Sequence, residues 1–244
     1  MAPAPSASKA DPRVSGESEA GASWPSIGIL GGTGPAGSGL AVRLADAGHS
    51  VLLGSRERDK AKHRVAELLE QWGDRVDTLE GVTNADAATA EIVILATVAE
   101  SVLATAIEHA DALAGRVVVS MANLLTRAPR GFAAVLPPDG SVAVEVQHAV
   151  PAARVVGAFQ NLPAKALGEL DHALDVDVVV CGDDAAAVAS VVTVIETMDG
   201  LHPVDGGPLI NAAAVEALTA VLLTINRARR GEHGIRVVEL RRFT

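Results

Sequence analysis

Residues 31–37 read Gly-Gly-Thr-Gly-Pro-Ala-Gly, and this stretch decides the fold. It follows a short apolar run at 26–30 and precedes a helical pattern at 38–45. A buried strand, a glycine turn and a helix are the context that the G-x-G-x-x-G dinucleotide fingerprint requires. The alternative is a glycine-rich turn that binds no ligand. The residues expected to contact a dinucleotide here are Gly32, Thr33, Gly34, Pro35, Ala36 and Gly37.

The second strand-like run, 50–54, indicates which dinucleotide binds, because it ends in Ser55 and Arg56. NAD-binding folds usually carry Asp or Glu here to accept hydrogen bonds from the ribose 2′-hydroxyl. A hydroxyl and a planar guanidinium suit a 2′-phosphate instead. Arg58 and Lys60 add positive charge nearby, so we expect NADP(H). The alternative is an exposed charged loop that opens the next helix.

Composition is that of a soluble enzyme. The 244 residues are 49% hydrophobic, enough for a large α/β domain and a smaller one. A net charge of −10 argues against nucleic-acid or anionic-membrane partners. The single cysteine, Cys181, excludes an internal disulfide and a cysteine-based zinc site, and its strand-like surroundings predict a buried thiol. No apolar run approaches the ~18 residues of a membrane span.

We predict three segments along the chain. Residues 1–25 are rich in Ala, Pro, Ser and Gly and predict a disordered extension. They lack the apolar core of a secretory signal, so the expected location is the cytoplasm. Residues 26–168 are expected to form a Rossmann-type domain, and 169–244 a smaller C-terminal α/β domain.

Strand and helix patterns alternate beyond residue 60, which predicts a doubly wound, parallel α/β sheet. Apolar runs at 91–96, 116–120 and 154–159 predict buried strands, and a helix is expected at 99–113. Ligands bind at the carboxyl ends of parallel strands. The candidate pocket walls are therefore the loops that contain Thr97, Val98, Met121, Asn161, Leu162 and Ala164.

The last third predicts two strands and two helices. Residues 176–181 form a strand pattern, and Asp183 and Asp184 are interpreted as the N-terminus of a helix that runs to Ile195 and not as a metal pair. We expect a short edge strand at 201–205. A final apolar helix, 211–230, suits packing against the first domain or against a second subunit.

Several motifs together resemble those of the F420:NADP oxidoreductases, which reduce the deazaflavin coenzyme F420 with NADPH. The resemblance covers the chain from Ile27 to about Arg236. The motifs are the Gly-Gly-Thr-Gly turn, Gly54-Ser55-Arg56 with Lys60, Leu162-Pro163-Ala164, Val180-Cys181-Gly182-Asp183-Asp184, Asp199-Gly200-Leu201, Gly207-Pro208-Leu209 with Asn211, and Gly231-Glu232-x-Gly-Ile. The chain departs from the family pattern at Gln160-Asn161 and at Pro35-Ala36.

The resemblance implies a role for two groups of residues and a homodimeric assembly. The 2′-phosphate would be surrounded by Ser55, Arg56, Lys60 and Thr33. The deazaflavin would be walled by Leu162, Ala164, Gly207 and Leu209.

Such a reaction needs no catalytic side chain, because a hydride passes between two bound cofactors. The chain has no Tyr and no Ser-x-x-x-Lys pair, and His148 and His172 are interpreted as structural. No catalytic residue and no metal site is therefore expected. Two alternatives remain: an NADP-dependent imine or keto-acid reductase with Lys165 as proton donor, and a non-catalytic NADP(H) sensor.

Overall fold

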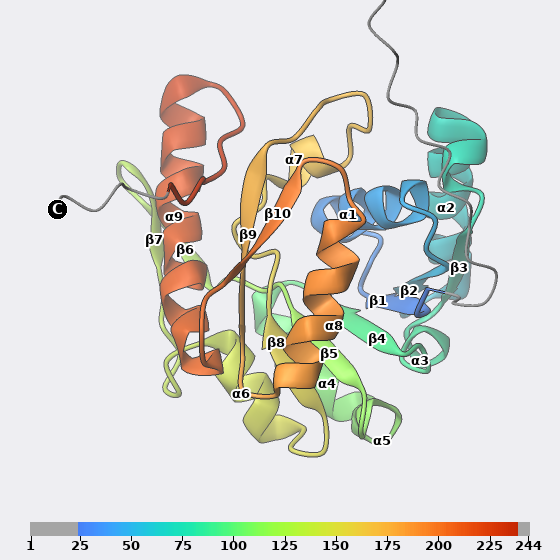
Figure 1. The fold of residues 1–244 in the computed structure, drawn as a ribbon, viewed down its shortest axis with the longest axis horizontal. Helices are drawn as coiled ribbons and strands as arrows, with labels where there is room; N and C mark the ends of the chain where they lie inside the picture. The colour runs from blue at the N-terminus through green and yellow to red at the C-terminus, as the bar shows by residue number, and fades with distance from the viewer. Residues whose placement is uncertain (1–23, 239–244) are drawn as a thin grey trace, which may run out of the picture.

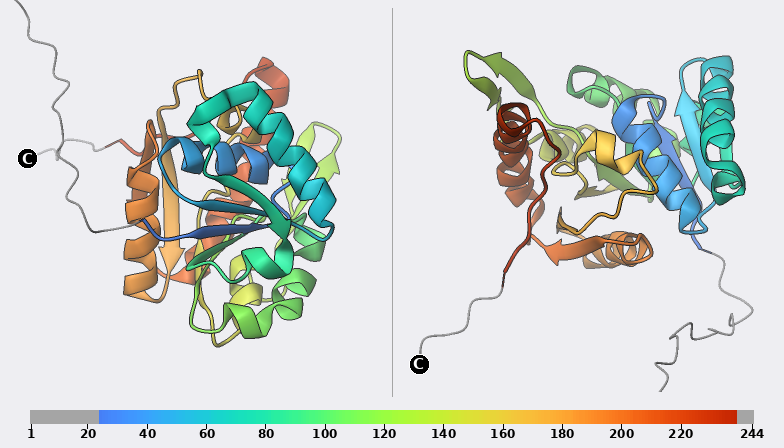
Figure 2. Two further views of the ribbon diagram at one scale, coloured as in Figure 1. Left: turned by 90° about the vertical axis from the view of Figure 1, so that its right-hand side faces the viewer. Right: turned by 90° about the horizontal axis from the view of Figure 1, so that it is seen from above.

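The computed structural model describes residues 24–238, and these form one mixed sheet of eight strands with helices on both faces (Figures 1 and 2). The expectation of a disordered extension falls almost wholly on residues 1–23, outside the described part. The sheet strands are β1 (Ile27–Leu30), β2 (Val51–Ser55), β3 (Leu79–Thr83), β4 (Ile92–Leu95), β5 (Val117–Ser120), β8 (Arg154–Gly157), β9 (Val176–Gly182) and β10 (Leu201–Asp205).

Helices connect most of the strands, and a two-stranded hairpin stands apart from the sheet. The helices are α1 (Pro35–Asp46), α2 (Arg58–Trp72), α3 (Asn84–Ala87), α4 (Ala99–Glu108), α5 (Ala110–Leu113), α6 (Val142–Ala149), α7 (Ala164–Leu167), α8 (Ala185–Glu196) and α9 (Ala212–Arg229), with 3-10 turns η1 (Gly73–Val76) and η2 (Leu209–Asn211). The hairpin pairs β6 (Leu125–Ala128) with β7 (Gly131–Ala134).

The strand order β10-β9-β8-β5-β4-β1-β2-β3 confirms the predicted Rossmann-type α/β fold. Strand β1 lies between β2 and β4 and pairs in parallel with both, so the chain winds outward in two directions from this point. Dinucleotides bind at such a reversal, beyond the carboxyl ends of the strands. The fold therefore places the 31–37 turn where a cofactor is expected.

Two apolar layers hold the helices against the sheet. Alternate residues of β1 face opposite ways, so Ile29 belongs to the apolar cluster that includes residues of α1, α2 and α8, and Leu30 to the cluster that includes residues of α3, α4 and α6. Both residues are fully buried. A strand that is buried on both faces needs apolar residues at nearly every position, and such a continuous apolar run is easy to recognise in a sequence.

The structure corrects several predicted elements. The helix expected at 99–113 breaks at His109 into α4 and α5. Strand β3, helices α3 and α6, and the β6–β7 hairpin have no counterpart in the prediction. Glu80 of β3 is exposed and Gly81 packs on the backbone of Lys62, so this edge strand lacks a continuous apolar pattern. The hairpin exposes Thr126 and turns at residues 129–130, and Gly131, the first residue of β7, has φ +128°.

Strands β9 and β10 extend the sheet of the first segment through a narrow seam. Only Val156↔Gly182 and Gly157↔Cys181 join β8 to β9, and they are antiparallel. The division at residue 168 stays a prediction. The edge position expected for 201–205 is confirmed, since β10 ends the strand order.

Helix α9 corrects the expectation that no apolar run approaches the length of a membrane span. The segment Leu209–Arg229 is long and apolar enough to cross a membrane by length and composition. Core helices of soluble proteins pass the same test. Here the helix packs against β7, α6 and β9 and carries the buried carboxyl of Glu216. These contacts fit a helix of the protein core.

Candidate functional site

The glycine turn is shaped by close packing at three positions. Gly31 has φ +70°, and its N–H donates to Asn84 Oδ1 at 3.0 Å. The N–H of Gly32 donates to the Gly54 carbonyl at 2.9 Å, which ties the turn to β2. A Cβ on Gly37 would lie 2.7 Å from Gly32 Cα, so this glycine lets α1 approach the turn. The conformation is therefore fixed by the backbone without a ligand.

Gly34 differs from those glycines, because a Cβ added there would meet nothing within 4 Å. It is the N-cap of α1 and provides no side-chain cap, and Pro35 follows at the first helical position. Pro35 has no N–H and the N–H of Ser38 donates to the Gly34 carbonyl at 2.9 Å, so the N–H groups of Ala36 and Gly37 are those of the first turn left for a ligand. This geometry fits a pyrophosphate at a helix N-terminus, as the fingerprint predicts.

The residues predicted for a 2′-phosphate lie at the end of β2 and the start of α2. Ser55 is buried and its Oγ accepts the N–H of Glu57 at 3.3 Å, while Arg56 and Lys60 are exposed. Arg58 forms an ion pair within the protein, because its guanidinium lies 2.5 Å from the carboxylate of Asp86. The extra positive charge that the sequence assigned to Arg58 is thus largely compensated.

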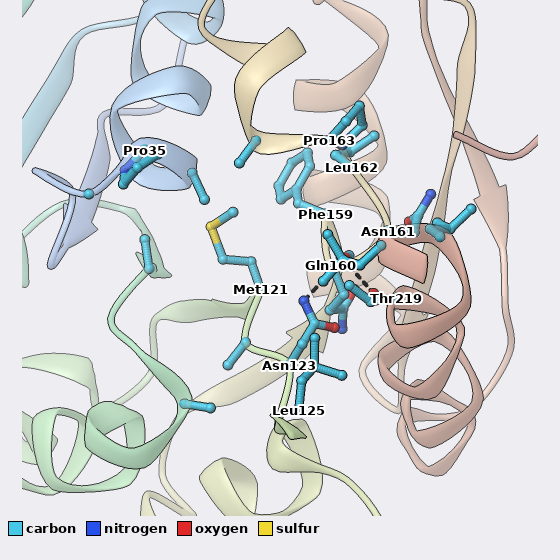
Figure 3. A pocket seen from close by; sticks show the side chains of 18 of the residues that line it. Pro35, Met121, Asn123, Leu125, Phe159, Gln160, Asn161, Leu162, Pro163 and Thr219 are labelled. Carbon is cyan, nitrogen blue, oxygen red and sulfur yellow. Dashed lines mark hydrogen bonds between the residues drawn. The ribbon is translucent and has the colours of Figure 1, made fainter. Parts of the chain in front are cut away.

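A cavity of about 450 Å³ opens between the glycine turn and α9 (Figure 3). The carboxyl ends of β4, β5 and β8 form its floor. Met121, Phe159 and Leu162 contribute apolar surface to it. Of the predicted site residues, the structure brings together around this cavity Gly34, Pro35, Ala36, Thr97, Val98, Met121, Asn161, Leu162 and Ala164.

The floor of the cavity also carries buried polar groups. Asn123 Nδ2 and Thr219 Oγ1 both donate to the Gln160 carbonyl, at 3.1 and 2.8 Å (Figure 3). Asn161 is 1% exposed and donates to the Asp177 carbonyl at 2.7 Å. Among the described residues, Thr97 Oγ1, Asn123 Oδ1 and Asn161 Oδ1 have no protein partner. Unpaired buried acceptors are costly unless something satisfies them, so the cavity suits a largely apolar ligand with polar edges.

Two predicted deazaflavin residues lie elsewhere. Leu209 is 2% exposed, packs in the core beside α6 and donates its N–H to Asp183 Oδ1 at 3.0 Å. Gly207 lies two residues before Leu209 and has φ +78°. Neither lines the cavity, because this turn leads into the first residues of α9 and the cavity follows the second half of that helix. Their contact with a ligand stays a prediction.

Sequence reasoning missed the cavity wall that α9 and the following segment provide. Thr219, Leu222 and Asn226 line it from the helix, and His233 lines it from beyond the helix, with Nδ1 2.8 Å from Asn226 Oδ1. An apolar helix gives no sign of which side faces a ligand. Phe159 was also missed; its φ of +69° at the end of β8 is visible only in the folded backbone.

The titratable groups proposed for other chemistry lie away from the cavity. Lys165 and His172 line a separate depression with Glu169 and Asp171. His148 is exposed and its Nδ1 lies 2.7 Å from Asp139 Oδ2. Lys165, the proton donor proposed for an imine reductase, is therefore not among the residues that line the cavity, although its neighbour Ala164 is.

The helix-cap and thiol predictions are confirmed. Asp184 is the N-cap of α8 and accepts the N–H of Ala187 at 2.7 Å. Cys181 is fully buried, and burial raises the pKa of its thiol to about 11. An inert thiol is the consequence.

Comparison with known proteins identifies the family. A family described as NADP oxidoreductase coenzyme F420-dependent matches residues 26–124. The F420-dependent NADP reductase of Methanocaldococcus jannaschii is 37% identical over 221 residues, which are 88% of this chain and 98% of that protein. The chain belongs to the F420-dependent NADP reductase family.

One solved structure agrees with this family assignment. It is described as a putative F420-dependent NADP reductase from Arthrobacter sp. FB24, has a TM-score of 0.72 and 31% identity, and covers 87% of this chain and 100% of its own. An imine reductase from Bacillus cereus has a TM-score of 0.57 and covers 84% of this chain and 62% of its own, but its 19% identity shows the shared fold alone. The F420-dependent NADP reductase family thus accounts for nearly the whole described chain.

Proposed function

We propose that this protein transfers a hydride between NADP(H) and coenzyme F420. The observation that carries the proposal is the cavity that joins the open face of Gly34 to the wall formed by α9. One end of it offers a helix N-terminus for phosphates, and the other offers apolar walls with unpaired polar atoms. Two ligands can therefore meet within it.

The chain's own residues bind and orient in this proposal. The first turn of α1 holds the pyrophosphate, and Thr33, Ser55, Arg56 and Lys60 recognise the 2′-phosphate. Met121 and Leu162 exclude water from the place where the ligands meet. When bound, the two cofactors supply the hydride donor carbon and the acceptor carbon. Orientation alone can contribute a large part of the rate enhancement.

Isotope transfer tests the reaction directly. With NADPH deuterated at the transferred C4 position, we expect the label at C5 of the deazaflavin, without dilution by solvent protons. The absorbance of F420 should fall at the same rate as that of NADPH. Label washed into water would contradict direct transfer.

Substitutions away from the cavity provide the control. Lys165→Ala, His148→Ala and His172→Ala should each retain turnover close to wild type, because none of these side chains lines the cavity. A true acid–base residue would cost about 10²–10⁴-fold. Collapse of turnover at unchanged cofactor binding in one of them would favour an imine or keto-acid reductase.

Assembly and location complete the proposal. The exposed apolar side chains Ile210 and Val221 on or beside α9, and Leu136 after the β6–β7 hairpin, support a homodimer. Light scattering at micromolar concentration should give twice the chain mass. The proposed location is the cytoplasm. The net charge of −10 supports small-molecule partners without nucleic-acid or membrane binding.

A further inference from the structure

A buried carboxyl on α9 has no role in the proposed function. Glu216 is 3% exposed, and its two oxygens accept the N–H groups of Val142 and Ala143 at 2.9 and 3.1 Å. These are the first N–H groups of α6, which Ser141 also caps through the N–H of Val144 at 3.1 Å. Glu216 therefore joins α9 to the N-terminus of α6 by two hydrogen bonds.

The same helix reaches the cavity one turn later. Thr219 lies at i+3 from Glu216, on the same side of α9, and lines the cavity while its hydroxyl donates to the Gln160 carbonyl. The position of this floor carbonyl therefore depends on where α9 sits.

The side chain of Gln160 lies where α6, α9 and β8 meet. A Cβ on Gly157 of β8 would be 2.9 Å from Gln160 Nε2, 3.0 Å from Ala212 Cβ and 3.6 Å from Ala143 Cβ. The amide is 2% exposed and neither of its polar atoms has a protein partner among the described residues. Its place is thus set by the spacing of the two helices that Glu216 connects.

We propose that Glu216 is a positioning residue for the deazaflavin side of the cavity, acting through α9, Thr219 and Gln160. The dinucleotide turn is anchored separately, by Asn84 and Gly54. Loss of the Glu216 contact should therefore weaken F420 binding selectively. This inference rests on the proposed function, because it takes F420 as the second ligand.

Binding measurements on three variants test it. We expect Glu216→Ala to raise the dissociation constant for F420 about tenfold, the size of one lost hydrogen bond. NADPH affinity, followed by its fluorescence, should stay at the wild-type value. Glu216→Gln keeps an oxygen acceptor and should restore most of the F420 affinity. In steady state the KM for F420 should rise more than kcat falls.

Ser141→Ala is the matched control, because it removes another cap of α6 without breaking a link to α9. It should leave F420 binding unchanged. Equal losses for Ser141→Ala and Glu216→Ala, or equal losses for F420 and NADPH, would overturn the proposal and make the residue a support of α6 alone.

A double-mutant cycle decides the matter if Glu216→Ala does not fold. Glu216→Asp, whose shorter side chain draws the carboxyl back from the N–H groups of Val142 and Ala143, and Thr219→Val should be clearly non-additive in F420 binding, because both act through the position of α9. Additive effects would overturn the proposal. A wild-type protein that fails to bind F420 would instead overturn the proposed function, so the two failures are distinguishable.

Discussion

At the scale of single residues, two neighbouring arginines have different roles. Arg58 pairs with Asp86, whose carboxylate also accepts the Thr83 hydroxyl in the capping box of α3. Arg56 has no ion pair within residues 24–238 and is exposed beside Ser55. The sequence assigned the 2′-phosphate to Ser55 and Arg56 and gave Arg58 only a nearby positive charge. The fold adds that this charge is paired with Asp86.

Arg56→Ala should therefore separate NADPH from NADH. We expect a loss of about 1.5–3 kcal/mol in NADPH binding, the range of a charge-assisted hydrogen bond, with NADH affinity nearly unchanged. Calorimetric titration with both cofactors measures this difference. Arg58→Ala is the control and should cost much less. Equal losses of NADPH and NADH in Arg56→Ala would mean that the side chain supports structure and does not bind the phosphate.

Glu216 should also affect stability in a pH-dependent way. Burial raises the pKa of its carboxyl to about 7 from an ordinary value of 4.5, despite its two backbone hydrogen bonds. Because the folded pKa is raised, folding favours the protonated form, and this contribution to stability is present below about 4.5 and lost as pH rises through about 7. Urea unfolding from pH 4.5 to 8 should show the decline in wild type.

The comparison is with Glu216→Gln, which carries no titrating group at this position. As pH rises, the unfolding free energy of the wild type should fall relative to that of the variant. The exposed Glu70→Gln should show no such trend. A wild-type-to-variant difference that is constant with pH would contradict the raised pKa.

At the scale of elements, the strand–turn–helix unit was the most predictable part. Residues 27–30, the turn and α1 form it as expected, because Gly31, Gly32 and Gly37 each have a close contact that the sequence pattern records. The α9 wall of the cavity was not predictable from the sequence. It is set by long-range contacts, such as Thr224 Oγ1 accepting the N–H of Phe132 at 3.1 Å, which no local pattern encodes.

Two alanine substitutions in the glycine turn should affect different properties, one the stability of the protein and the other its NADPH affinity. Gly37→Ala places a Cβ 2.7 Å from Gly32 Cα and 2.9 Å from the Gly32 carbonyl oxygen, so we expect a destabilisation of roughly 1–3 kcal/mol from overpacking. Gly34→Ala meets nothing within 4 Å and has φ −75°, so stability should be unchanged. Its methyl group instead occupies the space for the pyrophosphate, and NADPH affinity should fall.

Thermal melting and NADPH titration of both proteins test this pair of expectations. A Gly34→Ala protein with normal NADPH affinity would show that the phosphates do not approach the α1 N-terminus there. A Gly37→Ala protein as stable as wild type would show that α1 can move away from the turn at little cost.

At the scale of the whole molecule, we expect residues 1–23 to be dispensable. The described contacts already begin at Trp24, whose ring lies 5.3 Å from that of His49, and at Ser26, whose N–H donates to Glu91 at 2.9 Å. A chain that starts at Trp24 should therefore keep the melting temperature and both Michaelis constants of the full chain. A large rise in either Michaelis constant would show that the removed residues contribute to ligand binding.

Separation of strands β8 and β9 can be measured in this protein without introducing a label site. Its sole thiol, Cys181, lies in one of the two residue pairs of the narrow seam between these strands, fully buried and protonated at neutral pH. A thiol reagent can react only after the strands part, so the labelling rate measures how often they do. Labelling much faster than global unfolding would mean that residues beyond the seam detach as a unit while the dinucleotide half stays folded. Labelling at the unfolding rate would mean that both halves open together.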